Sequence, residues 1–242
     1  MRTMLKSLLL RLCLLLALAL PCVCRAARTP IIPLSLPLTS DAFARFYVEN
    51  PDRYEFFLRP EYAERAVHFT ARDASVPVQA DWFDAVSAEW RYYEAGRFSL
   101  DGYVYAVIIY NFPGEFDDPC LRVQLNGYDN QGVLRDALAL DTRYSFEDVE
   151  GCATYAIDGN TVSIQSYVGY SWDADNLEAG TVDKPVFQLI REKEYRIAGG
   201  RFTLLSEKKH PVSFIRRSRA GAAEGPAPPA RRQIASAFAL SR

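Results

Sequence analysis

The chain has 242 residues, of which 49% are hydrophobic and 13% aromatic, and its formal net charge at pH 7 is −2. This apolar content is enough to fill a packed core, and it excludes a wholly disordered, collagen-like or coiled-coil chain. Five cysteines in a chain of this length are too few for a small scaffold built on disulfides.

The first 26 residues have the three parts of a secretory signal peptide. Arg2 and Lys6 form a basic start, residues 12–20 are apolar, and small residues stand three and one positions before a cut after Ala26. A membrane anchor is the alternative, but the apolar stretch has only about half of the ~20 residues that a bilayer requires. We therefore predict that residues 1–26 are a cleaved signal peptide.

Lipid attachment at Cys22 or Cys24 is a further alternative for this segment. Pro21 and Val23 precede these cysteines, whereas bacterial lipidation prefers a small residue there. We therefore expect a soluble exported protein, periplasmic or extracellular, with no transmembrane span after removal of the signal.

Removal of the signal peptide leaves an acidic body. Residues 27–242 hold 24 basic and 30 acidic residues, a net charge of −6, and residues 27–213 hold 18 and 29, a net charge of −11. Such a body repels phosphates, which argues against a nucleic-acid partner, and it would suit a basic protein partner.

The mature chain begins with a short predicted helix and less regular structure. A helix is predicted at residues 41–49, because aromatic side chains, Phe43 and Phe46 among them, recur there at helical spacing. Residues 65–70 predict a strand, and residues 81–88 predict a short helix or a loop.

From residue 89 the sequence predicts an antiparallel meander of hairpins. Runs rich in β-formers alternate with turns that contain glycine. The predicted strand pairs are 90–100 with 103–110, 121–125 with 133–140, 153–157 with 161–167, and 186–197 with 202–206. The run 103–110 is apolar on both faces and predicts a central strand, while 146–151 and 171–185 predict loops. The expected fold is therefore mainly β, with α+β character at the N-terminus and a single β-rich domain over residues 27–213.

Residues 214–242 form a predicted disordered tail rich in arginine, alanine and proline. A segment with so few core-forming side chains buries too little apolar surface to offset its ordering entropy. Its six arginines and single acid, Glu224, would let it contact anionic surfaces; a solvated appendage without a partner is the alternative.

Two cysteines, Cys120 and Cys152, remain after the signal peptide. Export to an oxidising compartment predicts a disulfide between them, and the chain-entropy model gives such a bridge roughly 3–4 kcal/mol of stabilisation. A nucleophilic thiol is the alternative, and it would need His68 or His210 as its base.

Motifs of common catalytic and cofactor sites are absent from the sequence. It contains no G-x-S-x-G, H-E-x-x-H, Walker A, G-x-G-x-x-G or C-x-x-C pattern, and its two histidines, His68 and His210, are not expected to be catalytic. We expect no cofactor and no metal.

Acidic loops and aromatic residues supply the remaining candidates for a site. Carboxylates at 115–118, 147–150 and 173–178 would allow Ca²⁺ binding or glycoside hydrolysis, although solvated loops explain them as well. Aromatic residues beside the third loop could form a flat binding platform. The candidate binding residues are Tyr167, Tyr170, Trp172, Asp173, Asp175 and Glu178.

These features favour a non-enzymatic exported protein of the cell envelope that acts by binding. An inhibitor or an immunity-type module against a toxin is the concrete form of this expectation. The alternatives are a carboxylate-dependent hydrolase of carbohydrate or peptide and a structural envelope component.

Overall fold

The computed structural model describes residues 32–50, 55–63, 66–81, 83–84, 86–114, 118–146, 149–172 and 181–212. The predicted signal peptide, and the predicted tail from residue 214, lie outside these residues.

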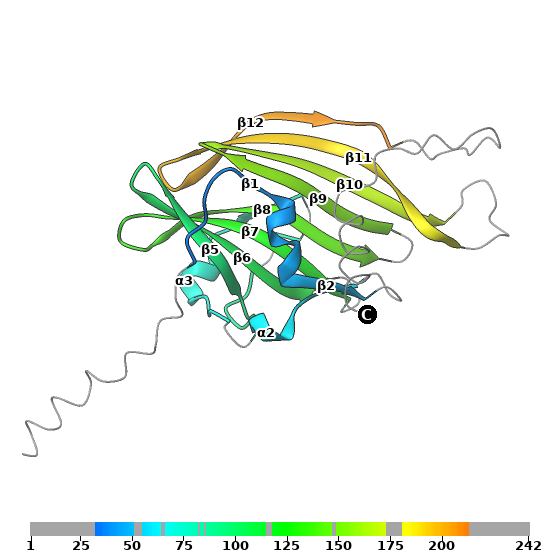
Figure 1. The fold of residues 1–242 in the computed structure, drawn as a ribbon, viewed down its shortest axis with the longest axis horizontal. Helices are drawn as coiled ribbons and strands as arrows, with labels where there is room; N and C mark the ends of the chain where they lie inside the picture. The colour runs from blue at the N-terminus through cyan, green and yellow to red at the C-terminus, as the bar shows by residue number, and fades with distance from the viewer. Residues whose placement is uncertain are drawn as a thin grey trace, which may run out of the picture. The chain divides into compact units, whose positions relative to one another are not determined.

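An antiparallel meander dominates the described structure and confirms the predicted fold class (Figure 1). Eight strands follow one another in chain order across the sheet. They are β5 (Tyr93–Leu100), β6 (Tyr103–Pro113), β7 (Pro119–Tyr128), β8 (Leu134–Phe146), β9 (Val149–Asp158), β10 (Thr161–Trp172), β11 (Thr181–Ala198) and β12 (Arg201–Lys209). The central position predicted for 103–110 is confirmed, because β6 pairs with β5 on one side and β7 on the other.

The N-terminal part supplies short elements that pack on this sheet or extend it. These are β1 (Leu38–Thr39), the 3-10 helix η2 (Ser40–Phe46), β2 (Tyr47–Asn50), β3 (Glu55–Leu58), α2 (Pro60–Ala63), α3 (Ala71–Ala74) and β4 (Val78–Gln79). β1 pairs with β9, β4 runs parallel to β8, and β2 and β3 form a separate hairpin.

All four predicted hairpins are present, and their turns explain why the sequence revealed them. Asp101 and Gly102 have φ angles of 52° and 79°, and Gly199 and Gly200 have 61° and 73°. Positive φ at both central residues is the geometry of a turn whose twist matches that of the two strands it joins.

The sequence predictions differ from the structure where long-range strand pairing determines where a helix or strand begins and ends. The predicted helix 41–49 is a 3-10 helix that ends at Phe46, because the chain then enters β2 and pairs with β3. The predicted loops 146–151 and 171–185 are partly strand, since β8, β9, β10 and β11 extend into them.

Two smaller N-terminal predictions are also corrected. The predicted strand 65–70 is reduced, among its described residues, to one bridge between Val67 and Tyr92. The described residues of 81–88 contain no helix, which leaves the loop alternative.

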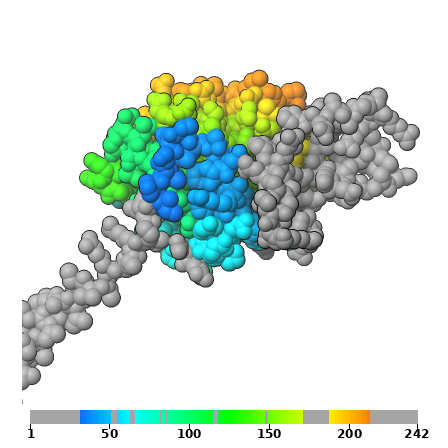
Figure 2. Space-filling view, viewed as in Figure 1, coloured from blue at the N-terminus to red at the C-terminus, as the bar shows by residue number. Residues whose placement is uncertain are grey.

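The sheet divides along β8 into two halves, one with β5, β6 and β7 and the other with β9, β10, β11 and β12, and these halves enclose the main core. β8 pairs with β7 along most of its length but with β9 only from Tyr144 to Phe146, so the strands diverge beyond this point. The core between them holds Tyr105, Leu125 and Leu138 from the first half and Ile157, Val162 and Ile197 from the second. η2 adds Phe43 and Phe46 to the same core, and Figure 2 shows the N-terminal residues, in blue, lying over this part of the sheet.

The two halves touch where the β11–β12 turn reaches β7. The Gly200 N–H donates to the Tyr105 hydroxyl at 3.0 Å. A Cβ added to Gly127 would lie only 2.3 Å from the Gly200 carbonyl oxygen. Glycine at position 127 therefore permits a backbone contact that a side chain would prevent.

Candidate functional site

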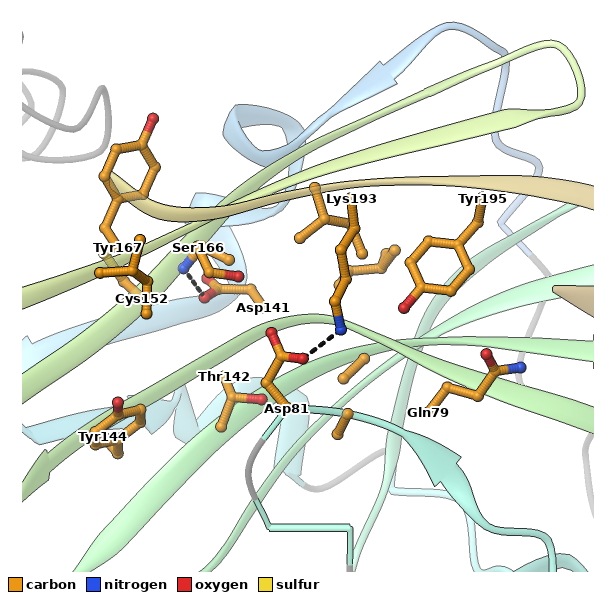
Figure 3. A pocket seen from close by; sticks show the side chains of 16 residues that line it. Gln79, Asp81, Asp141, Thr142, Tyr144, Cys152, Ser166, Tyr167, Lys193 and Tyr195 are labelled. Carbon is orange, nitrogen blue, oxygen red and sulfur yellow. Dashed lines mark hydrogen bonds and ion pairs between the residues drawn. The ribbon is translucent and has the colours of Figure 1, made fainter. Parts of the chain in front are cut away.

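A narrow cleft lies where the two halves of the sheet separate. β8, β9, β10 and β11 line it together with the residues that follow β4 (Figure 3). The cleft brings together positions as distant in sequence as Gln79 and Tyr195, so only the long-range pairing of the meander forms it.

Asp81 is the centre of an ion-pair cluster in this cleft. Its carboxylate accepts from the Lys193 ammonium and lies 2.6 Å from an Arg191 guanidinium nitrogen, and Figure 3 shows Lys193 extending toward it. All three side chains are mostly buried, and Arg191 also lies 3.4 Å from Glu207. These pairs hold β11 against the segment that follows β4.

A second buried pair lies on β8 beside the cleft. The two Asp141 carboxylate oxygens accept from the Arg143 Nε and the Ala153 N–H, each at 2.7 Å. Burial has the largest single effect on the pKa of Arg143 and lowers it, but the charge and hydrogen bond of Asp141, together with Tyr47 and Cys152, raise it overall. The Arg143 guanidinium also covers the rings of Tyr47 and Phe56, at 5.0 and 4.8 Å from their centroids.

The cleft is small. Its volume is about 50 Å³, which is room for a few water molecules. Asp81 and Asp141 bind neighbouring basic groups within the protein. The charged groups of the cleft therefore serve to join the two halves of the sheet.

A buried polar network lies on the face of β6 and β7 that points away from the main core. The Arg122 guanidinium donates to the Tyr110 hydroxyl, which donates to Gln124; Gln124 donates to Asn126, and Asn126 to Tyr128. Side chains on alternate positions of one strand share a face, which is why the polar residues of β7 form a continuous chain. Arg122 also donates to the Phe83 carbonyl oxygen and thereby holds Phe83 and its described neighbour Asp84 on this face.

Of the predicted binding residues, the structure describes the side chains of Tyr167 and Tyr170, and these two lie on opposite faces of β10. Tyr167 borders the cleft, and its hydroxyl donates at 3.2 Å to Gln165, an exposed residue of β10 that does not line the cleft. Tyr170 lies on the opposite face of β10, because the β9–β10 register is continuous and residues three apart on a strand face opposite ways. Trp172 ends β10, and Asp173, Asp175 and Glu178 lie outside the described residues.

The predicted disulfide is not present, and the strand order explains why. Cys120 lies on β7 and Cys152 on β9, with β8 between them. Two strand spacings are about 10 Å, whereas disulfide-linked Cα atoms are usually about 4.4–6.8 Å apart. Cys120 packs in the cluster with Phe112, where burial raises the pKa of its thiol to about 11.

A wider groove lies on the outer face of β9–β12. Its volume is about 500 Å³. Small or polar side chains from four adjacent strands line most of it: Thr154, Ala156, Ser163, Gln165, Glu192, Glu194, Ser206 and Lys208. The opposite face of these strands carries Ile157, Val162 and Tyr195 of the main core, so the groove lies on a well-supported surface.

The groove was not apparent from the sequence. Thr161 to Gln165 alternates apolar and polar residues, which predicts one wet face, but only the pairing of β9, β10, β11 and β12 brings Thr154, Ser163 and Glu194 together. Asp81 and Lys193, which join two regions 112 positions apart, gave no local signal either.

The chain was compared with models of protein families, with curated proteins and with solved structures. Nothing matches.

The described residues include no helix long and apolar enough to cross a membrane. They also include no group of three or more His, Cys, Asp or Glu side chains that could hold a metal ion.

Proposed function

We propose that this chain is an exported protein that binds a protein partner through the outer face of β9–β12. The observation that carries the proposal is the exposed groove of about 500 Å³ on this face. A groove of mostly small polar side chains allows close approach of a partner's backbone and side chains, while the flanking charges select the partner.

The charges around the groove are arranged for such selection. Glu192 and Glu194 lie on β11, and Lys208 lies on β12 at 3.4 Å from Glu192. Ser163 and Gln165 of β10 are exposed between these charges and the more apolar Ala156. A partner that covers this face would form hydrogen bonds with side chains of both β10 and β11.

The compartment is part of the proposal and depends on residues 1–26. Their basic start, apolar stretch and small residues before Ala26 support cleavage and export. An inhibitor or immunity-type module of the cell envelope is the form of binding protein that best suits this combination.

The test is partner capture with a blocked groove. The immobilised chain is exposed to envelope and culture-supernatant fractions of the host, and retained proteins are identified by mass spectrometry. Ser163→Arg places a long cation in the groove, whereas Ser99→Arg makes the same change at an exposed position of β5.

We expect one dominant partner, held in a stoichiometric ratio, that Ser163→Arg loses and Ser99→Arg keeps. Capture that Ser163→Arg leaves unchanged would remove the groove from the proposal. Failure to retain any protein would contradict a protein-binding function.

A further inference from the structure

The outer edge of β12 provides a more specific inference, which rests on the proposed binding function. We propose that β12 receives an extended, acidic segment of the partner protein, which adds to the sheet as a further strand. Addition of a strand at a sheet edge uses backbone hydrogen bonds for affinity and side-chain contacts for selectivity.

The backbone of β12 is capped at its start and open beyond it. The Phe202 N–H donates to the Asp136 carboxylate at 2.9 Å, and the Gln79 amide donates to the Phe202 carbonyl at 3.0 Å. From residue 203 to 209, β12 pairs with β11 and with no other strand of the described chain. Seven residues are enough for a strand of ordinary length.

The open stretch carries two exposed leucines. Leu204 and Leu205 are each 45% exposed. The register of β11 and β12 shifts between Glu194 and Tyr195, so that Leu204 pairs with Tyr195, Ser206 pairs with Glu194, and Leu205 is an added residue. A bulge of this kind turns neighbouring side chains toward the same side, which gives an incoming strand an apolar contact.

The charge of β12 selects an acidic occupant. β12 carries the cations Arg201, Lys208 and Lys209 and one acid, Glu207. Glu207 lies 3.4 Å from Arg191 and Lys208 lies 3.4 Å from Glu192, both on β11. Residues 191–209, which form the paired parts of β11 and β12, hold six basic and three acidic residues, a net charge of +3. Because salt screens charges beyond about 10 Å, the local cations outweigh the acidic body at this edge.

The same charges argue against a second copy of the chain as the occupant. Two copies paired through this edge would bring together two hairpins that each carry a net charge of +3 over residues 191–209, and such like-charged edges repel one another. An acidic segment reverses this interaction.

The probe for the test is a blocked nine-residue peptide of alternating glutamate and valine. Binding to the full chain is measured by calorimetry, and amide hydrogen exchange locates the site. One control peptide has lysine in place of glutamate, and another has N-methyl groups on alternate valines, which removes backbone donors without changing charge.

We expect the acidic peptide to bind and to slow exchange of the amides between residues 203 and 209. Both control peptides should bind at least roughly tenfold more weakly. In the protein, R201E/K209E should weaken binding of the acidic peptide at least roughly tenfold, and L204S/L205S should also weaken it. Arg91→Glu is the matched charge reversal at an exposed position outside β12 and should leave binding unchanged.

Several results would overturn the assignment. They are equal binding of the acidic and basic peptides, protection outside 203–209, or no binding up to about 1 mM peptide, the weak end of specific recognition. A dimer through β12 that the peptide does not disrupt would replace the acidic segment with a second copy. Partner capture that depends on Ser163 but not on Arg201 and Lys209 would leave the proposed function in place and refute this edge as its site.

Discussion

The two edges of the main sheet differ in how their backbone groups are used. On β5, the Arg97 N–H donates to the Ile32 carbonyl at 2.9 Å, and the Leu34 N–H donates to the Arg97 carbonyl at 2.7 Å. Val67 and Tyr92 exchange two further backbone hydrogen bonds just before β5 begins. The chain that precedes the sheet therefore covers this edge.

Among the described residues, hydrogen bonds cover the β12 edge at Phe202, from the side chains of Gln79 and Asp136. An edge with unpaired backbone groups and exposed leucines can pair with another chain, and its lysines limit which chain does so. One edge is therefore closed by the protein's own backbone, while the described part of the other carries basic and apolar side chains beside an open backbone.

Gly127→Ala is expected to have the largest effect, because it breaks the contact that places β12. The new Cβ would lie 2.3 Å from the Gly200 oxygen, and two backbones would have to separate. We expect a loss of about 3 kcal/mol in the free energy of unfolding, measured by urea denaturation. Gly102→Ala is the control, since its Cβ has open space and only the positive φ is unfavourable; equal losses for the two variants would contradict the close contact.

Asp136→Ala removes the cap at the start of β12 and should extend the open edge. Its carboxylate accepts from the Phe202 N–H and from the Gln79 amide. Loss of hydrogen bonds to a charged group should cost about 2 kcal/mol in urea denaturation. Amide exchange at Phe202 should accelerate strongly, whereas Asp158→Ala, an exposed carboxylate at the end of β9, should leave it unchanged.

Gly96→Ala tests the covered edge in the same way. A Cβ at this position would lie 2.7 Å from the Ile32 carbonyl oxygen and from Leu34. The segment of residues 32–34 should move away at a cost of about 1 kcal/mol, and amide exchange at Arg97 should increase roughly fivefold, since each 1.4 kcal/mol is a factor of ten. Unchanged protection of Arg97 would show that residues 32–34 do not close this edge.

The sequence predicted the hairpins because their signals are local. Asp101-Gly102 and Gly199-Gly200 adopt the positive φ angles that glycine-containing turns allow, and the alternation in Thr161–Gln165 matches one buried and one exposed face. Strand ends were less predictable. β8 and β9 continue into 146–151 because Tyr144 to Phe146 find partners across the turn, which depends on register rather than on composition.

The candidate site was largely hidden from sequence reasoning. The pairing of Asp81 with Lys193 and the groove between β9 and β12 arise from long-range contacts. The predicted disulfide was wrong because spacing along the chain does not show that β8 separates Cys120 from Cys152. The aromatic platform was assembled from adjacent positions, yet Tyr167 and Tyr170 face opposite sides of β10.

The smallest expected effect concerns the far end of β12, where side chains supplement the backbone. His210 Nε2 lies 2.6 Å from the Glu192 carboxylate, and Lys208 lies 3.4 Å from the same oxygen. The His210 hydrogen bond lowers the pKa of Glu192. A carboxylate whose pKa is lowered by folding stabilises the folded state above its ordinary pKa, and the stabilisation disappears as the pH falls through the lowered value.

The end of β12 should therefore loosen in acid, below about pH 4, the region of an ordinary glutamate. The measurement is amide exchange at residues 207–210 across pH 3–6, corrected for the intrinsic pH dependence of exchange. Glu192→Gln should remove most of this acid-dependent loosening, because no carboxylate remains to be protonated. Glu194→Gln changes a neighbouring exposed carboxylate on the same strand face and should retain it. An acid response that survives Glu192→Gln would mean that a titrating group other than Glu192 loosens the end of β12 in acid.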